Sequence, residues 1–244
     1  MFGLHYRMCF RCQANILAYD YSGYGWSDGE ATENAVYADI RKVVYFAVHS
    51  LHVPLHRIIL YGHSVGSGPS CDIAAKGKMK DLGGIILHSS IASGLRLFIN
   101  NIEKAPWFDA FQNAEKLKKV RDVPLLLIHG RLDRQVPFAH SLKLEASCRE
   151  ADARYEQQQQ QQQQKSSSSS RCCFGSSSQL RKTETPQTKD AELRRHRVQT
   201  WWVPDADHND VEHKAGDEYY RRISAFLAFC AKWHADRDAK IAST

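Results

Sequence analysis

Short apolar runs alternate with helical patterns along most of the chain, and this alternation limits the folds that are open to it. We predict strands at Asn15–Tyr19, Arg57–Tyr61, Gly84–His88, Val123–Ile128 and Val198–Val203. Apolar residues at helical spacing predict helices at Val36–Ala47, Val65–Lys76, Phe138–Cys148 and Tyr220–Cys230. Apolar strands that are separated by helices form a parallel sheet covered on both faces. The sequence therefore predicts an α/β fold, a mostly parallel sheet with helices on both faces.

One stretch, Ala151–Arg197, has a composition unlike the rest. It contains an unbroken glutamine run, Gln157–Gln164, and a serine run, Ser166–Ser170. Such a polar stretch cannot bury enough apolar surface to offset the entropy lost on ordering, so we expect it to be disordered. The residues after it form one strand and one helix, too few for a core. We therefore predict one discontinuous domain, residues 1–150 and 198–236, interrupted by a low-complexity insertion at 151–197.

Charge and cysteine usage exclude several classes of protein. The net charge is +6, and most of that excess lies in 151–197, which holds nine basic and five acidic residues. The fold itself therefore lacks the basic surface that nucleic acid requires. No apolar run approaches the roughly 18 residues of a membrane span, and we expect no signal peptide. Seven scattered cysteines, an odd number, indicate reduced thiols in a cytoplasmic protein.

The motif Gly62-His63-Ser64-Val65-Gly66 follows a predicted strand and opens a predicted helix. This is the context of a nucleophile elbow, in which a strained turn projects the serine hydroxyl from the sheet. Side chains at the flanking positions would clash, so glycine occupies both. The alternative is an ordinary glycine-rich turn with a capping serine. We expect the side chain of His63 to turn away from the hydroxyl, and we do not assign it as the base.

A serine nucleophile needs a base and an acid that orients the base. Asp133 follows the predicted strand at 123–128, and His208 follows the last predicted strand. Because the carboxyl ends of parallel strands meet at one edge, we expect Ser64, Asp133 and His208 to form a catalytic triad there. Asp205 and Asp207 are rival acids, but they share a loop with His208 and are better explained as turn formers.

Several motifs together closely resemble the alpha/beta-hydrolase-domain-containing 17 family of acyl-protein thioesterases. They are Asp20–Gly25, Arg57–Gly66, Leu87–Ser90, Ser93–Arg96, Phe108–Phe111, Val123–Asp133 and Ala206–Asp210. The resemblance covers most of the chain outside 151–197. It implies an alpha/beta hydrolase that removes palmitate from protein cysteines, with Ser64 as nucleophile, Asp133 as acid and His208 as base. It also implies peripheral association with membranes and an oxyanion hole that includes the Val65 N–H.

The sequence departs from the family pattern near its start. The family carries an N-terminal cysteine cluster and earlier strands, one of which ends in a His-Gly-Asn loop that donates to the oxyanion hole. We expect this chain to lack those N-terminal strands and the second donor, and the loss of one donor costs about 10²–10³ in rate. A truncated, inactive fragment is one alternative to an active hydrolase.

The chemistry predicted here needs no metal and no cofactor. We expect an acylated protein or a lipid-like acyl compound as substrate. Leu95–Ile99, Trp107, Phe108 and Phe111 lie between two predicted strands, where they either line an acyl pocket or pack into the core. The triad does not separate a thioesterase from a lipase, a carboxylesterase or a serine-aminopeptidase-like enzyme, because the fold hosts many substrates.

Overall fold

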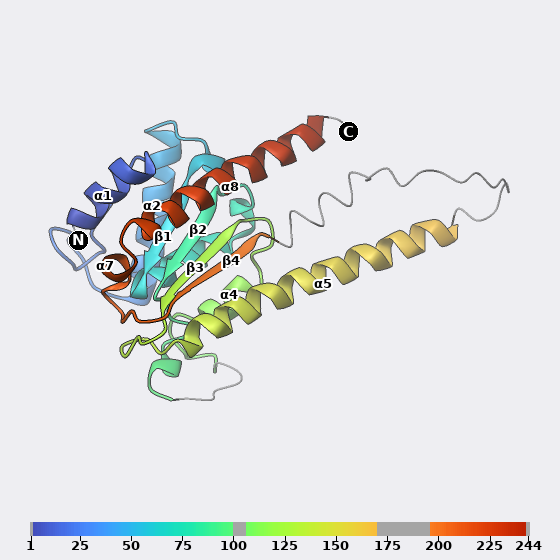
Figure 1. Cartoon of the computed structure of the whole chain (residues 1–244). Helices are drawn as coiled ribbons and strands as arrows, with labels where there is room; N and C mark the ends of the chain where they lie inside the picture. The colour runs from blue at the N-terminus through green and yellow to red at the C-terminus, as the bar shows by residue number, and fades with distance from the viewer. Residues whose placement is uncertain (1, 100–105, 170–195, 243–244) are drawn as a thin grey trace.

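A computed structural model describes residues 2–99, 106–169 and 196–242 of the chain. Its sheet is parallel and has the order β1-β2-β3-β4 (Figure 1). The strands are β1 (Ile59–His63), β2 (Gly84–His88), β3 (Leu125–Gly130) and β4 (Val198–Val203). Four of the five predicted strands are confirmed, with β1 and β3 running two residues further toward the predicted site than expected.

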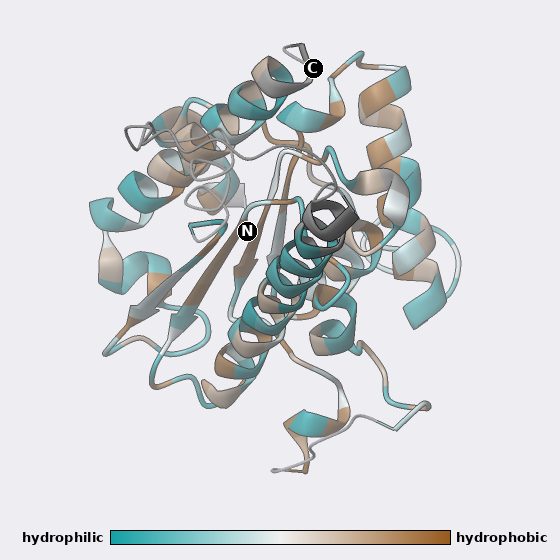
Figure 2. Ribbon diagram, turned by 90° about the vertical axis from the view of Figure 1, so that its right-hand side faces the viewer, coloured by the Kyte–Doolittle hydropathy of each residue, from teal (hydrophilic) through white to brown (hydrophobic). Residues whose placement is uncertain are grey.

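Helices cover both faces of the sheet, as predicted. One face carries α2 (Glu33–His49), α3 (Ser67–Ala74), α4 (Asn113–Leu117) and α5 (Ala139–Ser169). The other face carries α1 (Phe2–Cys12), α7 (Val211–Ala215) and α8 (Asp217–Ala242). Short 3-10 helices lie at Leu55–Arg57, Ser64–Gly66, Gly77–Met79 and Leu95–Leu97. The strands are hydrophobic and lie between helices that also carry hydrophilic residues (Figure 2).

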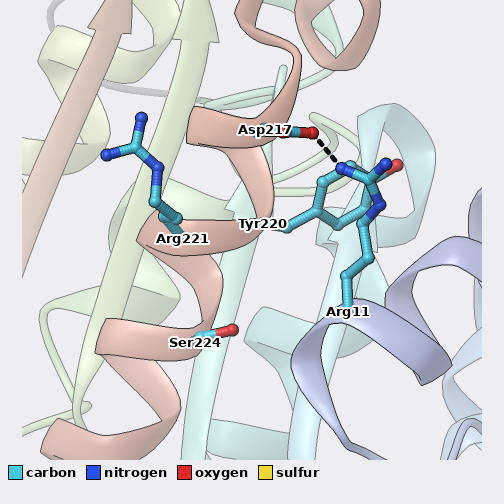
Figure 3. A pocket seen from close by; sticks show the side chains of 5 residues that line it. All are labelled: Arg11, Asp217, Tyr220, Arg221 and Ser224. Carbon is cyan, nitrogen blue, oxygen red and sulfur yellow. Dashed lines mark hydrogen bonds and ion pairs between the residues drawn. The ribbon is translucent and has the colours of Figure 1, made fainter.

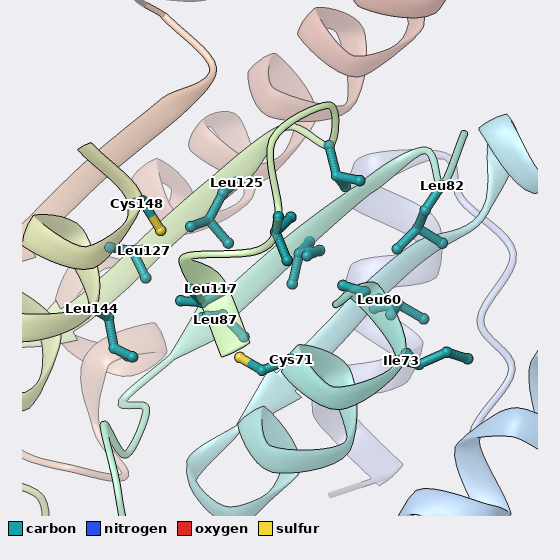
Figure 4. Packing of buried hydrophobic residues seen from close by; sticks show 14 of the residues in the cluster. Leu60, Cys71, Ile73, Leu82, Leu87, Leu117, Leu125, Leu127, Leu144 and Cys148 are labelled. Carbon is teal, nitrogen blue, oxygen red and sulfur yellow. The ribbon is translucent and has the colours of Figure 1, made fainter. Parts of the chain in front are cut away.

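The period of two along each strand divides the core into two clusters. Leu125 and Leu127 of β3 pack against the α2–α5 side, where Figure 4 shows them beside Leu117, Leu144 and other buried aliphatic side chains. Their neighbours along the strand belong to the cluster on the α1–α8 side. Because both sides of the central strands are buried, their residues are mostly apolar, which is the pattern that made them predictable.

The predicted strand at Asn15–Tyr19 is wrong, because residues 14–20 form neither helix nor strand. Ile16 and Leu17 are 39 % and 49 % exposed, so this apolar run does not enter the sheet. A strand exists only when its backbone N–H and C=O groups find a neighbouring strand. β1 is the end of the sheet order, and no described strand pairs with the segment. Its hydrophobicity alone was therefore misleading.

The structure also differs from the expectation of disorder, because α5 continues through the glutamine run to Ser169. Its first turns are anchored in the core by Leu144 and Cys148, and glutamine is a good helix former, so propagation beyond the anchor is favourable. Arg197, which directly precedes β4, has a buried guanidinium that pairs with Asp152 of α5 at 2.7 Å. Residues 170–195 of the predicted insertion lie outside the described residues, and the domain boundaries stay a prediction.

The two longest described helices, α5 and α8, contain 31 and 26 residues. The second half of α5 extends away from the sheet (Figure 1). α8 packs one side against the sheet through Tyr219, Ile223 and Phe226. Neither helix, nor any other in the part of the chain that is described, has an apolar stretch that matches a bilayer crossing.

Candidate active site

Ser64 lies at the carboxyl end of β1 in a left-handed backbone conformation, with φ of 53°. A β-carbon on Gly62 would lie 2.5 Å from the carbonyl oxygen of Gly66. Only glycine therefore fits at position 62, where the turn brings two stretches of backbone close together. The chain then enters the 3-10 helix Ser64–Gly66 and α3, whose first N–H groups have no partner within the helix. Strand, strained serine and helix follow one another as the nucleophile elbow requires.

Asp133 and His208 are in direct contact although 75 residues separate them. Nδ1 of His208 lies 2.7 Å from Oδ2 of Asp133, and both residues are buried. Burial alone would raise the pKa of Asp133, but hydrogen bonds from His129, His208 and the Val136 N–H hold it well below its usual range. The carboxylate is therefore charged at neutral pH. It accepts the Nδ1 proton of His208, and Nε2 is left as the acceptor that a general base needs.

The loop that carries His208 is fixed by further hydrogen bonds. Oδ1 of Asp207 accepts from the His208 N–H at 2.8 Å and from the Arg134 N–H at 2.9 Å. The Asp207 N–H in turn donates to Oδ1 of Asp210 at 2.6 Å. Asp207 is thus engaged with its own loop and with Arg134, in agreement with its interpretation as a turn former.

The structure brings Ser64, Asp133 and His208 to one edge of the sheet. Asp133 and His208 are in direct contact, whereas, among the described residues, no hydrogen bond joins Ser64 Oγ to His208. The connection runs through the neighbouring residue instead, because the rings of His63 and His208 are 5.0 Å apart between centroids. The His208 loop therefore crosses the carboxyl edge from β4 to the end of β1, where the elbow begins.

His129 was not assigned a role from the sequence, yet it contacts the candidate acid. Its Nε2 is 3.2 Å from Oδ2 of Asp133 and donates to the Val136 carbonyl at 2.9 Å. Its Nδ1 lies 2.6 Å from the hydroxyl of Ser141. The side chain is fully buried near the end of β3. The sequence did contain a sign of this contact, because His129 is a polar residue within an otherwise apolar strand. A buried imidazole requires hydrogen-bond partners.

The segment after β2 passes over the same edge of the sheet. Its surface is aromatic, and Phe98 and Trp107 are 85 % and 90 % exposed. Phe111 is placed differently, because a β-carbon on Gly68 of α3 would lie 2.3 Å from its ring. The two exposed rings are not core residues, whereas Phe111 packs onto the helix that follows Ser64. An acyl pocket in this region stays a prediction.

Two open cavities lie away from the predicted triad. The first, about 510 Å³, is formed between α1 and α8 (Figure 3) and is lined by Arg11, Asp217, Tyr220, Arg221 and Ser224. Arg11 pairs with Asp217 there and stacks over the Tyr220 ring. The second, about 600 Å³, contains Asp72 surrounded by Arg41, Lys76 and Lys116. Neither cavity includes Ser64, Asp133 or His208.

The chain matches known protein families in sequence. Residues 9–94 match the family described as alpha/beta hydrolase fold, and residues 92–172 match the prolyl oligopeptidase family. The alpha/beta hydrolase domain-containing protein aho-3 of Caenorhabditis elegans is 30% identical over 222 residues, 91% of this chain and 51% of that protein. The 17C protein of Xenopus tropicalis is 39% identical over 218 residues, 89% of this chain and 54% of that protein. The chain thus spans about half the length of these relatives.

Solved structures show the same fold at low sequence identity. A Pyrococcus furiosus esterase, Pf2001, superposes with a TM-score of 0.60 at 15% identity, covering 91% of this chain and 72% of the esterase. An alpha-beta hydrolase from Vibrio vulnificus gives 0.56 at 18% identity, covering 85% and 61%. The resemblance to the alpha/beta-hydrolase-domain-containing 17 family is confirmed by the curated relatives. The chain has the alpha/beta hydrolase fold and is similar in sequence to the alpha/beta hydrolase domain-containing 17 proteins.

Proposed function

We propose that the protein is a serine hydrolase that cleaves acyl thioesters and esters, with protein S-palmitoyl-cysteine as its substrate. The observation that carries the proposal is the 2.7 Å hydrogen bond between Asp133 and His208, at the sheet edge where the elbow presents Ser64. This bond leaves His208 Nε2 as an acceptor, and the ring of His208 lies 5.0 Å between centroids from that of His63, the residue before Ser64. A charged acid, an oriented base and a serine on a strained turn are the parts that acyl transfer needs.

In the proposed mechanism, His208 Nε2 takes the proton of Ser64 as Oγ attacks the thioester carbonyl. Asp133 stabilises the imidazolium that forms, and the Val65 N–H donates to the oxyanion. The intermediate collapses, the C–S bond breaks, and the substrate thiol leaves with the proton from His208. Water then attacks the acyl-enzyme, again with His208 as base, and releases the fatty acid and free Ser64. The steps use the Ser64, Asp133 and His208 side chains, the Val65 N–H and water.

Two observations support an acyl substrate. Relatives that match most of the chain are named alpha/beta hydrolase domain-containing 17 proteins, and the resemblance to that family implies an acyl-protein thioesterase. The segment after β2 also presents exposed Phe98, Ile99, Trp107 and Phe108, apolar side chains that would contact a long acyl chain. Such side chains are costly to leave in water, so burial against a hydrocarbon chain would be favourable.

A peptide or amide hydrolase is the second candidate, because residues 92–172 match the prolyl oligopeptidase family. That enzyme would use the same serine, acid and base and would differ in the leaving group. An inactive domain is the non-enzymatic alternative. The two enzymes predict different preferred substrates and the inactive domain predicts no turnover, so turnover measurements separate the three candidates.

The test compares hydrolysis of an S-palmitoylated peptide, a monoacylglycerol and an aminoacyl amide by the wild type, Ser64→Ala and Ser147→Ala. Ser147 is a matched control, since its buried hydroxyl has no hydrogen-bond partner in the described structure. We expect the thioester to be turned over fastest, by wild type and Ser147→Ala only. Faster turnover of the amide would favour the peptidase. No turnover of any substrate by cooperatively folded wild type would contradict the proposed function.

A further inference from the structure

The backbone carbonyl of His208 is held by side chains from the ends of two strands. Nε2 of His63, the last residue of β1, lies 3.3 Å from this oxygen. The hydroxyl of Ser89, which directly follows β2, donates to the same oxygen at 3.4 Å. The candidate base is therefore anchored at two points, by its ring to Asp133 and by its backbone to β1 and β2.

The geometry fixes the tautomer of His63. A carbonyl oxygen only accepts hydrogen bonds, so Nε2 of His63 must carry the proton. Burial lowers the pKa of His63, with the neighbouring His208 ring adding to the effect, so the imidazole is neutral at pH 7. A neutral ring at this position is needed, since a charged one would oppose the imidazolium that forms on His208 during catalysis.

A buried polar cluster fixes the His63 ring from behind. The ring of His88 at the end of β2 lies 4.7 Å from that of His63 in an edge-on arrangement. Nδ1 of His88 is 2.7 Å from the hydroxyl of Tyr61, which is 2.7 Å from the hydroxyl of Tyr219 on α8. Tyr61 and His63 share one face of β1, so the cluster is continuous from α8 to the His208 loop.

We propose that His63 is a positioning residue for His208: it donates its Nε2–H to the His208 carbonyl and holds the base at the elbow. The proposal rests on the proposed function for its catalytic consequence. Its structural part does not, because the contact exists whatever reaction the site performs. His63 directly precedes Ser64 in the elbow motif, so the residue that supports the base lies beside the nucleophile in the chain.

The loss of this hydrogen bond affects turnover rather than substrate affinity. The contacts of His63 in the structure are with His208 and His88, so we expect KM to change little. Displacement of a catalytic group by about 1 Å can cost roughly 100-fold in rate. We therefore expect kcat to fall about 10- to 100-fold in His63→Phe, which keeps an aromatic ring but has no donor. His63→Gln places an amide N–H near the position of Nε2 and should recover most of the loss.

His234 provides a matched control at the opposite edge of the sheet. Its Nε2 lies 3.2 Å from the carbonyl oxygens of Leu82 and Gly83, so it makes the same kind of hydrogen bond from a more buried position than His63. His234→Phe should lower the melting temperature and leave kcat unchanged. If His63→Phe behaves as His234→Phe does, with lower stability and wild-type kcat on a short p-nitrophenyl ester, His63 is merely structural and the proposal is wrong.

A measurement that needs no turnover separates this proposal from the proposed function. The Nδ1 proton of His208, hydrogen-bonded to Asp133, is observable by NMR in ¹⁵N-histidine-labelled full chain. We expect its exchange with water to be at least about fivefold faster in His63→Phe and near wild type in His63→Gln and His234→Phe. An unchanged exchange rate in His63→Phe would overturn the positioning role. If Ser64→Ala retained full turnover while exchange responded as expected, only the proposed function would fail.

The second donor allows a stricter test. His63 and Ser89 donate to one oxygen, so their contributions should be coupled. In the cycle of His63→Phe, Ser89→Ala and the double variant, we expect the combined effect on the exchange rate to differ from the product of the single effects by at least about threefold. Independent effects of the two substitutions would show that the carbonyl contact does not carry the positioning.

Discussion

Nε2 of His129 lies 3.2 Å from Oδ2 of Asp133, and neither side chain reaches solvent. The same oxygen binds Nδ1 of His208, and the other carboxylate oxygen accepts the N–H groups of Gln135 and Val136. Both oxygens of the candidate acid are thus saturated with donors. This arrangement is specific for a carboxylate, because an amide in its place would direct two N–H bonds toward groups that are already donors.

Substitution of the acid should therefore abolish catalysis without unfolding the protein. In Asp133→Asn, the amide favours the opposite tautomer of His208, and we expect kcat to fall by roughly 10⁴. Hydrolysis of a short p-nitrophenyl ester measures this, with Asp205→Asn, a substitution of an exposed residue of the same loop, as the control. More than a tenth of wild-type kcat in Asp133→Asn would show that another residue orients the base.

The tight turn at the elbow makes Gly62 irreplaceable. In Gly62→Ala the new methyl group would lie 2.5 Å from the Gly66 carbonyl oxygen, and backbone must shift to relieve it. We expect a loss of about 1–3 kcal/mol in unfolding free energy, with loss of activity because Ser64 moves. Gly77→Ala is the matched control, as nothing lies within 4 Å of the position that its methyl group would take. Urea denaturation compares the two; equal stability would contradict the described turn.

Stability should decrease on mild acidification. Burial lowers the pKa values of His63, His88, His140 and His234, most strongly for His88. The unfolded chain then binds more protons than the folded one, so the stabilisation is complete above the unfolded pKa of about 6.5 and is lost as pH falls below it. Each of these histidines changes the unfolding free energy by at most about 1.4 kcal/mol per pH unit.

His88→Phe tests this dependence at the residue with the largest shift. Nε2 of His88 has no partner among the described residues, and Tyr61 and Tyr219 keep each other as hydrogen-bond partners without it. Urea midpoints between about pH 5 and 7.5 should therefore vary less in His88→Phe than in wild type. Parallel curves for the two proteins would mean that His88 is not held neutral by the fold.

The buried ion pair Arg197–Asp152 joins β4 to α5 on the two sides of residues 170–195. The guanidinium is fully buried and also donates to the Val123 carbonyl at 2.9 Å. In Arg197→Met we expect a loss of about 2 kcal/mol in unfolding free energy, less than the roughly 3–5 kcal/mol of a fully buried pair because Asp152 keeps some contact with solvent. Arg149→Ala removes the exposed ion pair with Glu145 within α5 and should change the unfolding free energy by less than about 0.5 kcal/mol. Urea denaturation measures both, and equal losses in the two variants would contradict a structural role for the buried pair.

The elements that the sequence predicted correctly are those whose local pattern of apolar residues is enough to identify them. β2 and β3 are apolar on both faces, so Gly84–His88 and Val123–Ile128 were recognisable without tertiary information. Asn15–Tyr19 has the same local pattern and is not a strand, because pairing depends on a neighbour that local sequence does not reveal. The length of α5 was missed because low complexity was equated with disorder, although glutamine favours helix once a core anchors the first turns.

The candidate site also has features that the sequence predicted and features that it did not. The elbow glycines and the positions of Asp133 and His208 after strands were visible in the sequence, since strand ends meet at one edge. The contacts of His129 and His63 were not, because both involve backbone carbonyls of loops whose path the sequence does not encode locally. The places of the candidate residues after strand ends were therefore predictable, whereas their contacts with His129 and His63 were found only in three dimensions.

Covalent labelling identifies the nucleophile without any assumption about the substrate. A fluorophosphonate reacts with a serine whose hydroxyl is activated by a base, and peptide mass mapping identifies the modified residue. We predict a single adduct on Ser64, absent in Ser64→Ala and strongly slowed in His208→Ala. Equal labelling of Ser64→Ala, or an adduct on another serine of the folded wild type, would contradict the assignment of Ser64 as the nucleophile.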